Sequence, residues 1–378
     1  MPPFAVRARW HAAAHFDWDD ILHLNLREGH AAYQSEYTGG KDRRAYAVTI
    51  HGEIRGEGAS LEEAEVRMAN ALRAPLPVLA VASNAAVGEM LLVASHGLDL
   101  FQPQPFVGYW TPAAEEWLPP GDRRIDLAAT RALLEAVVDQ SQAEVLLRAY
   151  EAYRRALSHW FPEELLLAGE FLYVAAETLS RFLIEQRAEN QGMTPKNLAK
   201  LEHAGGPDSL RSRYLRDGIF AGDTAAFEAM NAASNGFEHG YLSIAEVRGL
   251  FQGTLAHSMG LVRRALIEAA QPPDVAKETL LHGYDEPRGL PPTFAFVRGN
   301  ISAVDPSNPP VLDGGAIELD WKRPQVSVTT NSTGEPEINI PLNATVTDKP
   351  DDVELKLTQV AVRAGYSRFE EPVQASSE

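Results

Sequence analysis

Residues 234–240, which read Ser-Asn-Gly-Phe-Glu-His-Gly and are called the polar knot below, gather several side chains that can do chemistry. Asn235 and His239 are four residues apart, so in a helix they share one face. A histidine titrates near neutral pH and can act as a general acid or base. Glu238 is placed to orient or to repel a phosphate. The competing interpretation is structural: Ser234 or Asn235 caps a helix, and His239 is a buried, hydrogen-bonded packing residue.

The elements that must position the polar knot are helices. Residues 163–188 predict the strongest helix, because apolar side chains recur every three to four positions after Pro162. Residues 244–266 predict a second long helix, which the polar knot opens. Several amphipathic helices within about 150 residues are typical of an antiparallel bundle, here expected over 122–271.

A helical bundle that carries a polar residue, three intervening residues and a histidine resembles the HEPN superfamily. These are small α-helical domains, many of them metal-independent RNases of toxin–antitoxin, CRISPR and phage-defence systems. The resemblance covers about residues 125–270 and implies that His239 is the catalytic histidine and Asn235 the polar residue, with Glu238 in the spacer. The family's phosphate-contacting arginine falls on Ser234, which can donate a hydrogen bond but carries no charge.

The resemblance also implies a reaction and a partner. The RNA 2′-hydroxyl would attack the adjacent phosphate while His239 moves protons, without a metal, and a homodimer formed through the bundle would bring two polar knots to one cleft. Arg211, Arg213 and Arg216 are the candidate RNA-binding residues, because they form a compact basic group near the knot. The alternative is that these arginines form a solvated surface.

A metal site or cofactor is not expected. Glu170 and Glu177 are seven residues apart and share a face of the predicted helix. A carboxylate-bridged metal site in a bundle uses Glu-x-x-His pairs from facing helices, and the sequence has none. Phosphate-binding glycine loops and the Gly-x-Ser-x-Gly elbow are also missing from the sequence.

The first 121 residues predict a small α+β domain with a proline-rich exit linker. Residues 45–55 alternate apolar and polar side chains and predict a strand. Ser60–Glu63 has the capping-box pattern that begins a helix. Residues 77–83 and 88–95 predict two further strands.

Beyond the bundle, prolines mark 272–292 as a linker. Residues 293–370 alternate with a period of two between Pro, Gly, Asn and Asp turns, which is typical of an antiparallel β-sandwich. Residues 371–378 predict a disordered tail. The expected fold class is therefore multidomain α+β: a central HEPN-like bundle flanked by a small α+β domain and an antiparallel β domain.

Composition limits the functions that this chain can have. The absence of cysteine excludes disulfides, and no apolar run approaches the roughly 20 residues of a membrane span. Without a secretory signal we expect a cytoplasmic protein. The net charge of −18 argues against a general nucleic-acid coat. Residues 122–270 carry 16 basic and 20 acidic side chains against 18 and 32 elsewhere, so the helical part repels a polyanion least.

Two functions fit these observations. The first is a HEPN-like protein that acts on or associates with RNA, in phage defence or stress response. The second is a non-catalytic assembly or sensor protein whose bundle dimerises and whose β domains bind a protein partner. An accessible His239 in a cleft favours the first, and a buried His239 bonded to backbone favours the second.

Overall fold

The structure is a computed structural model of the 378-residue chain. It describes residues 2–38, 46–98, 105–108, 123–161, 164–290, 293–305, 307, 318–322, 327–330, 336–339, 343–348, 351 and 353–364. The chain forms two compact units, the first made of residues 1–37, 47–111 and 120–290 and the second of residues 38–46, 112–119 and 291–378. The predicted tail at 371–378 lies outside the described residues, as does most of the predicted proline-rich linker.

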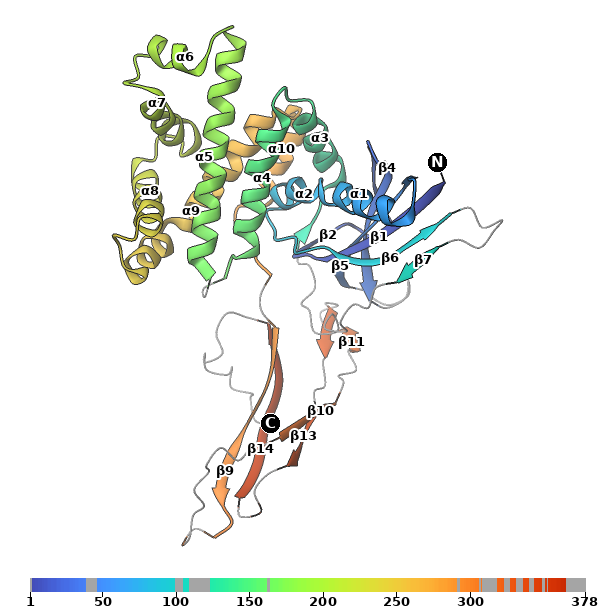
Figure 1. Ribbon diagram of the computed structural model, residues 1–378. Helices are drawn as coiled ribbons and strands as arrows, with labels where there is room; N and C mark the ends of the chain where they lie inside the picture. The colour runs from blue at the N-terminus through green and yellow to red at the C-terminus, as the bar shows by residue number, and fades with distance from the viewer. Residues whose placement is uncertain are drawn as a thin grey trace. The chain divides into compact units, whose positions relative to one another are not determined.

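The first unit is mixed α+β and contains a six-stranded antiparallel sheet in the order β3-β4-β5-β1-β6-β7 (Figure 1). The strands are β1 (Pro3–His11), β3 (Leu22–Leu26), β4 (Gly29–Thr38), β5 (Tyr46–Glu57), β6 (Leu91–Gly97) and β7 (Phe106–Gly108). The strand predicted at 45–55 is confirmed as β5, whose residues 49–57 pair with the full length of β1. A short parallel bridge joins β2 (Ala14–His15) to β8 (Arg123–Arg124).

The segment between β5 and β6 contains two helices where one was predicted. Helix α1 (Leu61–Arg73) begins as expected: the Ser60 hydroxyl accepts the Glu63 N–H at 3.2 Å. The strand predicted at 77–83 is wrong, because these residues belong to helix α2 (Leu76–Ser83), whose every side chain is buried. A short apolar run surrounded on all sides by protein has no polar face, so its period cannot distinguish a helix from a strand.

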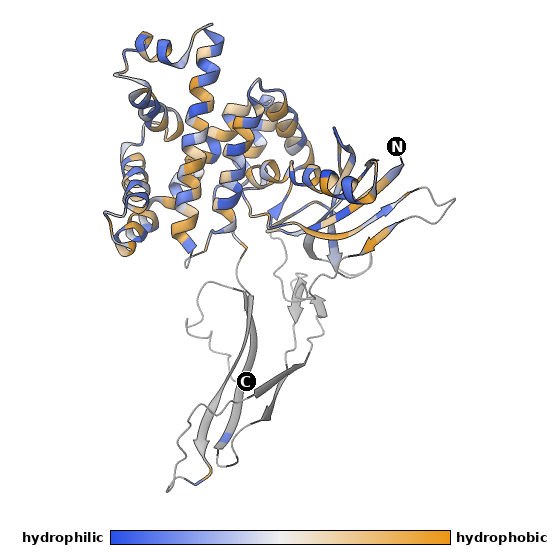
Figure 2. Ribbon diagram, viewed as in Figure 1, coloured by the Kyte–Doolittle hydropathy of each residue, from blue (hydrophilic) through white to orange (hydrophobic). Residues whose placement is uncertain are grey.

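The rest of the first unit is helical. The helices are α3 (Leu127–Val138), α4 (Ala143–Ser158), α5 (Leu165–Asn190), α6 (Pro195–Leu201), α7 (Pro207–Arg213), a π-helical segment η3 (Tyr214–Ile219), α8 (Thr224–Glu238), α9 (Ile244–Ala270) and α10 (Asp274–Gly283). The two predicted long helices are confirmed as α5 and α9, and both interleave apolar and polar residues along their length (Figure 2). A membrane-spanning helix is absent from the described part of the chain.

Part of the predicted linker at 272–292 is helix α10. Its side chains Ala276 and Leu280 are buried in the same core as the other helices. Pro273 stands at the N-cap position of α10, where a missing N–H costs no helical hydrogen bond. The prolines at this point therefore begin a helix rather than mark an extended connection.

One apolar core runs through the first unit. It joins Trp10 of β1 and Met68 of α1 to Tyr150 of α4 and Met259 of α9. The boundary predicted at 121/122 does not separate two cores, since buried residues on both sides of it belong to this cluster.

Three buried arginines meet the segment 81–88, which leads from α2 towards β6. Arg263 of α9 donates to the carbonyl oxygens of Val81 at 2.8 Å and Ala82 at 3.0 Å. Arg123 donates to the carbonyls of residues 83 and 84, and Arg154 to that of residue 87. A helix leaves its last carbonyls without partners and carries partial negative charge at that end, so guanidinium groups suit this position.

Asn84 completes the junction. It takes the left-handed conformation at φ 47° and is fully buried. Its amide oxygen accepts the Tyr153 hydroxyl at 2.7 Å, and its amide nitrogen donates to the Tyr284 carbonyl at 3.0 Å. Asparagine tolerates the left-handed region better than most residues do. Strand-forming and helical parts of the first unit are thus joined by hydrogen bonds as well as by apolar packing.

The described residues of the second unit include six strands, which form three pairs. The antiparallel pairs are β9 (Thr293–Ala303) with β14 (Val353–Ala364), β10 (Glu318–Lys322) with β13 (Asn343–Asp348), and β11 (Ser327–Thr330) with β12 (Pro336–Asn339). The antiparallel strands predicted for this region are confirmed. Their assembly into a sandwich stays a prediction.

We expect Arg263→Met to destabilise the first unit by about 3–5 kcal/mol, because it leaves buried carbonyls at the ends of α2 and α10 without donors. Urea unfolding followed by circular dichroism measures this change. Arg264→Met is the matched control, since the neighbouring arginine is exposed. Equal free energies of unfolding for the two variants would contradict the role assigned to Arg263.

Candidate functional site

The polar knot lies at the end of a helix rather than at the beginning of one. Residues 234–238 form the last turn of α8, and His239 is its C-terminal cap. Gly240 then takes a φ of 66°, a left-handed conformation that glycine adopts without strain and that ends helices. Helix α9 begins separately, with a capping box formed by Ser243 and Glu246. The prediction that the knot opens the last long helix is therefore wrong.

Ser234 faces helix α5 and not solvent. Its side chain is buried, and its hydroxyl donates to Oε2 of Glu170 at 3.0 Å. Glu170 belongs to α5, 64 positions earlier in the chain. In the HEPN motif the equivalent place holds an arginine that contacts phosphate, whereas here it holds a contact between two helices.

Asn235 is also engaged within the protein. Its side-chain nitrogen donates to the backbone carbonyl of Asn231 at 2.7 Å and to the Asn231 amide oxygen at 3.1 Å. The same amide oxygen accepts the hydroxyl of Tyr173 from α5 at 2.6 Å. Ser234 directly, and Asn235 through Asn231, thus belong to one interface between α5 and α8, called the α5–α8 latch below.

Glu238 and His239 are exposed, as are Phe237 and Gly240 of the knot. The backbone N–H of His239 donates to the Asn235 carbonyl at 3.0 Å, which completes the last turn of α8. Within the described residues no hydrogen bond or ion pair to the imidazole is found. The prediction of a buried, backbone-bonded histidine is wrong, because the His239 side chain is exposed at the C-terminal end of α8.

Glu170 is the titrating group of the latch. Burial raises the pKa of its carboxyl from 4.5 to about 7, the Ser234 hydrogen bond lowers it, and the charge of Glu238 raises it. Its second oxygen, Oε1, is buried without a hydrogen-bond partner among the described residues. A carboxyl group in such a place is more stable when it is neutral. Sequence reasoning considered Glu170 only as a metal ligand and missed this role.

Tyr173 lies in the same anionic surroundings. Burial raises the pKa of its hydroxyl, and the charges of Glu177, Glu238 and Glu170 raise it further, while Arg211 lowers it. The carboxylates of Glu177 and Glu238, joined by that of Glu170 when it is ionised, therefore surround this part of α5 against the guanidinium of Arg211. A phosphate group approaching the latch meets net negative charge.

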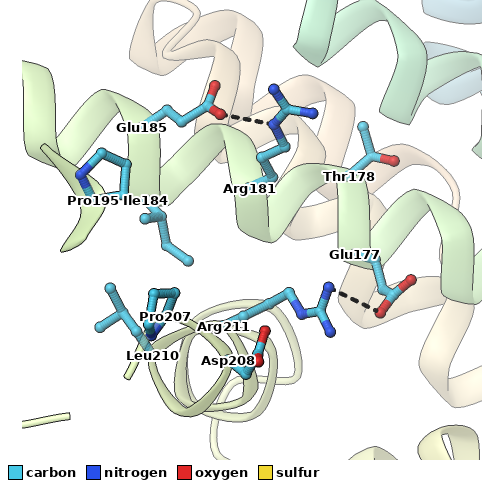
Figure 3. A pocket seen from close by; sticks show the side chains of 10 residues that line it. All are labelled: Glu177, Thr178, Arg181, Ile184, Glu185, Pro195, Pro207, Asp208, Leu210 and Arg211. Carbon is cyan, nitrogen blue, oxygen red and sulfur yellow. Dashed lines mark hydrogen bonds and ion pairs between the residues drawn. The ribbon is translucent and has the colours of Figure 1, made fainter. Parts of the chain in front are cut away.

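The three arginines proposed to bind RNA are each paired with an acid. Arg211 lies 3.9 Å from Glu177, and Figure 3 shows this pair spanning from α7 to α5. Arg213 forms an ion pair with Glu202 and donates to its backbone carbonyl at 3.0 Å. The Arg216 guanidinium is 2.7 Å from the carboxylate of Asp217. Their positive charge is largely balanced locally.

The hollow beside Arg211 has a volume of about 350 Å³ and lies between α5 and α7 (Figure 3). Its rim carries a second ion pair, Arg181 with Glu185 at 2.7 Å, and Ile184 and Leu210 lie beneath. Both arginines on this rim are matched by glutamates, so the hollow offers no excess positive charge to a polyanion. The described side chains also contain no group of three or more His, Asp or Glu residues placed to bind a metal ion.

Comparison of this chain with known protein families, with curated proteins and with solved structures gave no match. The site is therefore interpreted from its own geometry.

We expect the stability of the first unit to depend on Glu170 protonation. The folded-state pKa of about 7 exceeds the ordinary value of 4.5, so the stabilising contribution is fully present below pH 4.5 and is lost as the pH rises through 7. Because the side chain is only partly buried, water screens the effect to roughly 1 kcal/mol.

Urea unfolding at several pH values between 4.5 and 8 measures this contribution. The neutral variant Glu170→Gln removes that part of the pH dependence and is the more stable protein at pH 8. Glu185→Gln removes a carboxylate from the same helix and keeps Glu170, so its pH dependence stays like that of the wild type. Parallel curves for wild type and Glu170→Gln would refute the assignment.

Proposed function

We propose that this chain is a non-catalytic assembly protein whose helical part self-associates through the turn between α8 and α9. The observation that carries the proposal is the engagement of Ser234 and Asn235 in the α5–α8 latch, through hydrogen bonds to Glu170 and Asn231. Ser234 bonds α5 directly and Asn235 supports Asn231, which bonds Tyr173 of α5, so neither side chain turns towards a substrate without breaking these bonds. The polar knot then has a structural role, which is to fix the end of α8.

The surface around the knot supports self-association. Phe237, Tyr241 and Ile244 are 43%, 61% and 63% exposed, and all three lie between the end of α8 and the start of α9. Exposed apolar side chains that gather in this way mark protein–protein contacts, and aromatic residues are enriched there. Residues of the second unit would provide the surface for a further protein partner.

Charge also supports an assembly role over RNA binding. The α5–α8 latch carries Glu170, Glu177 and Glu238 near one another, and the nearby arginines are paired. RNA binding depends on unneutralised Lys and Arg side chains that replace counterions along the phosphate backbone. A protein contact needs no such excess.

We expect the wild-type chain to dimerise and the double variant Tyr241→Glu/Ile244→Glu to dissociate at least ten times more readily, because two charges would enter the apolar contact. Sedimentation velocity over a range of protein concentrations measures both dissociation constants. Val275→Glu is the control, since Val275 on α10 is 79% exposed and lies away from the turn in sequence. A monomeric wild type, or a double variant that dimerises equally well, would rule out this surface.

A HEPN-type RNase is the second candidate function, and one observation favours it. His239 is exposed beside Glu238 at the end of α8, so its imidazole is accessible to a substrate in the manner that the resemblance implies. This candidate predicts metal-independent cleavage of RNA that disappears when the imidazole is removed. It requires another group to supply the positive charge that Ser234 lacks.

A further inference from the structure

A second hollow in the first unit lies along a sheet edge, far in sequence from the polar knot. It has a volume of about 480 Å³ and is lined by His23–Leu26 of β3 on one side and by residues of α2, α3 and α4 on the other. Its apolar lining consists of Leu24, Leu26, Pro75, Val78, Leu134, Val137, Val138 and Leu147. We call this hollow the β3 groove.

Strand β3 is an edge strand whose only partner among the described residues is β4. The hairpin closes at the pair Leu26–Gly29 after a two-residue turn, so Leu26, Leu24 and Leu22 exchange backbone hydrogen bonds with β4. The backbone N–H and C=O groups of the intervening residues, His23 and Asn25, then face the open edge. A second peptide backbone is the ligand that matches donors and acceptors at this spacing.

The side chains of the groove define the occupant further. Leu24 and Leu26 are partly buried on one face of β3, whereas His23 and Asn25 are exposed on the other. Val138, at the end of α3, lines the groove and is 66% exposed. An added strand would therefore place alternate side chains against this apolar wall and the others in solvent.

The charge of the groove selects among extended ligands. The exposed carboxylates of Glu135 and Asp139 stand on the α3 rim against the single arginine Arg131, and the whole chain has a charge of −18. These charges favour a ligand with net positive charge.

We propose that the β3 groove binds an extended, basic segment of another protein by strand addition, with apolar side chains at alternate positions. Edge strands that stay unpaired beside an apolar surface are prone to aggregation unless a partner covers them. This inference does not depend on self-association at the α8–α9 turn.

The test uses random dodecapeptides displayed on phage and selected against the full-length chain. We expect the enriched peptides to alternate apolar and polar residues and to carry basic residues. A labelled synthetic copy of the most enriched peptide then allows binding to be measured by fluorescence polarisation.

Two pairs of variants decide how the peptide binds. Asn25→Pro removes one outward-facing N–H without removing a backbone hydrogen bond between β3 and β4, and Asn25→Ala keeps that N–H; both variants lose the side-chain bond to His30, so the pair isolates the N–H. Val138→Glu places a charge in the groove, and Val66→Glu places one on α1, where Val66 is 60% exposed. We expect Asn25→Pro and Val138→Glu each to weaken binding at least tenfold and the two controls to bind like the wild type.

Circular dichroism spectra confirm that each variant is folded. The double variant Tyr241→Glu/Ile244→Glu separates this inference from the proposed function, because we expect it to keep its affinity for the peptide. Three results would overturn the inference. They are the failure of selection to enrich any peptide, wild-type binding by Asn25→Pro, and equal loss in Asn25→Ala, which would indicate side-chain recognition instead of strand addition.

Discussion

The first unit depends on the buried guanidinium groups that satisfy the carbonyls of segment 81–88. Arg263, Arg123 and Arg154 come from three separate places in the sequence and converge on one short connection. Burial lowers the pKa of Arg263, whose hydrogen bonds go to backbone oxygens at the C-terminal ends of α2 and α10. Two helix ends thus offset a charge that would otherwise be costly to bury. This junction fixes α9 against the ends of α2 and α10. The helices that pack on α9 are thereby held in position as well.

The α5–α8 latch is a second, weaker constraint built on that frame. It joins the helices through single hydrogen bonds between neutral or neutralised groups, and one member, Glu170, titrates near pH 7. Its position determines what the side chains of the polar knot contact. Helical spacing brings Asn235 and His239 to one side of α8, but Ser234 bonds Glu170 of α5, and Asn235 bonds Asn231 of α8, which in turn accepts the Tyr173 hydroxyl of α5. The end of the knot, from Phe237 to Gly240, remains exposed.

Local patterns predicted the elements of this fold better than the contacts between them. Helices α5 and α9 follow from apolar periodicity, and α1 follows from its cap at Ser60, since both signals lie within a few residues. The sequence predicts a strand in place of helix α2, because a completely buried helix has no polar face from which its period can be recognised. Arg263 and Arg264 are adjacent residues of the same type, yet Arg263 is buried and Arg264 is exposed. The role of Glu170 could not be predicted from the sequence either, because its partner Ser234 lies 64 positions away.

Restoring the missing arginine gives the most direct measurement. The variant Ser234→Arg completes the HEPN motif, and its cleavage of labelled RNA in EDTA is compared with that of wild type and of Ser234→Arg/His239→Ala, alongside urea unfolding. If position 234 serves the α5–α8 latch, a long charged side chain at this buried site destabilises the unit by about 1–3 kcal/mol, and none of the proteins cuts RNA. A stably folded Ser234→Arg that cuts RNA only when His239 is present would contradict the account and establish the knot as a nuclease site.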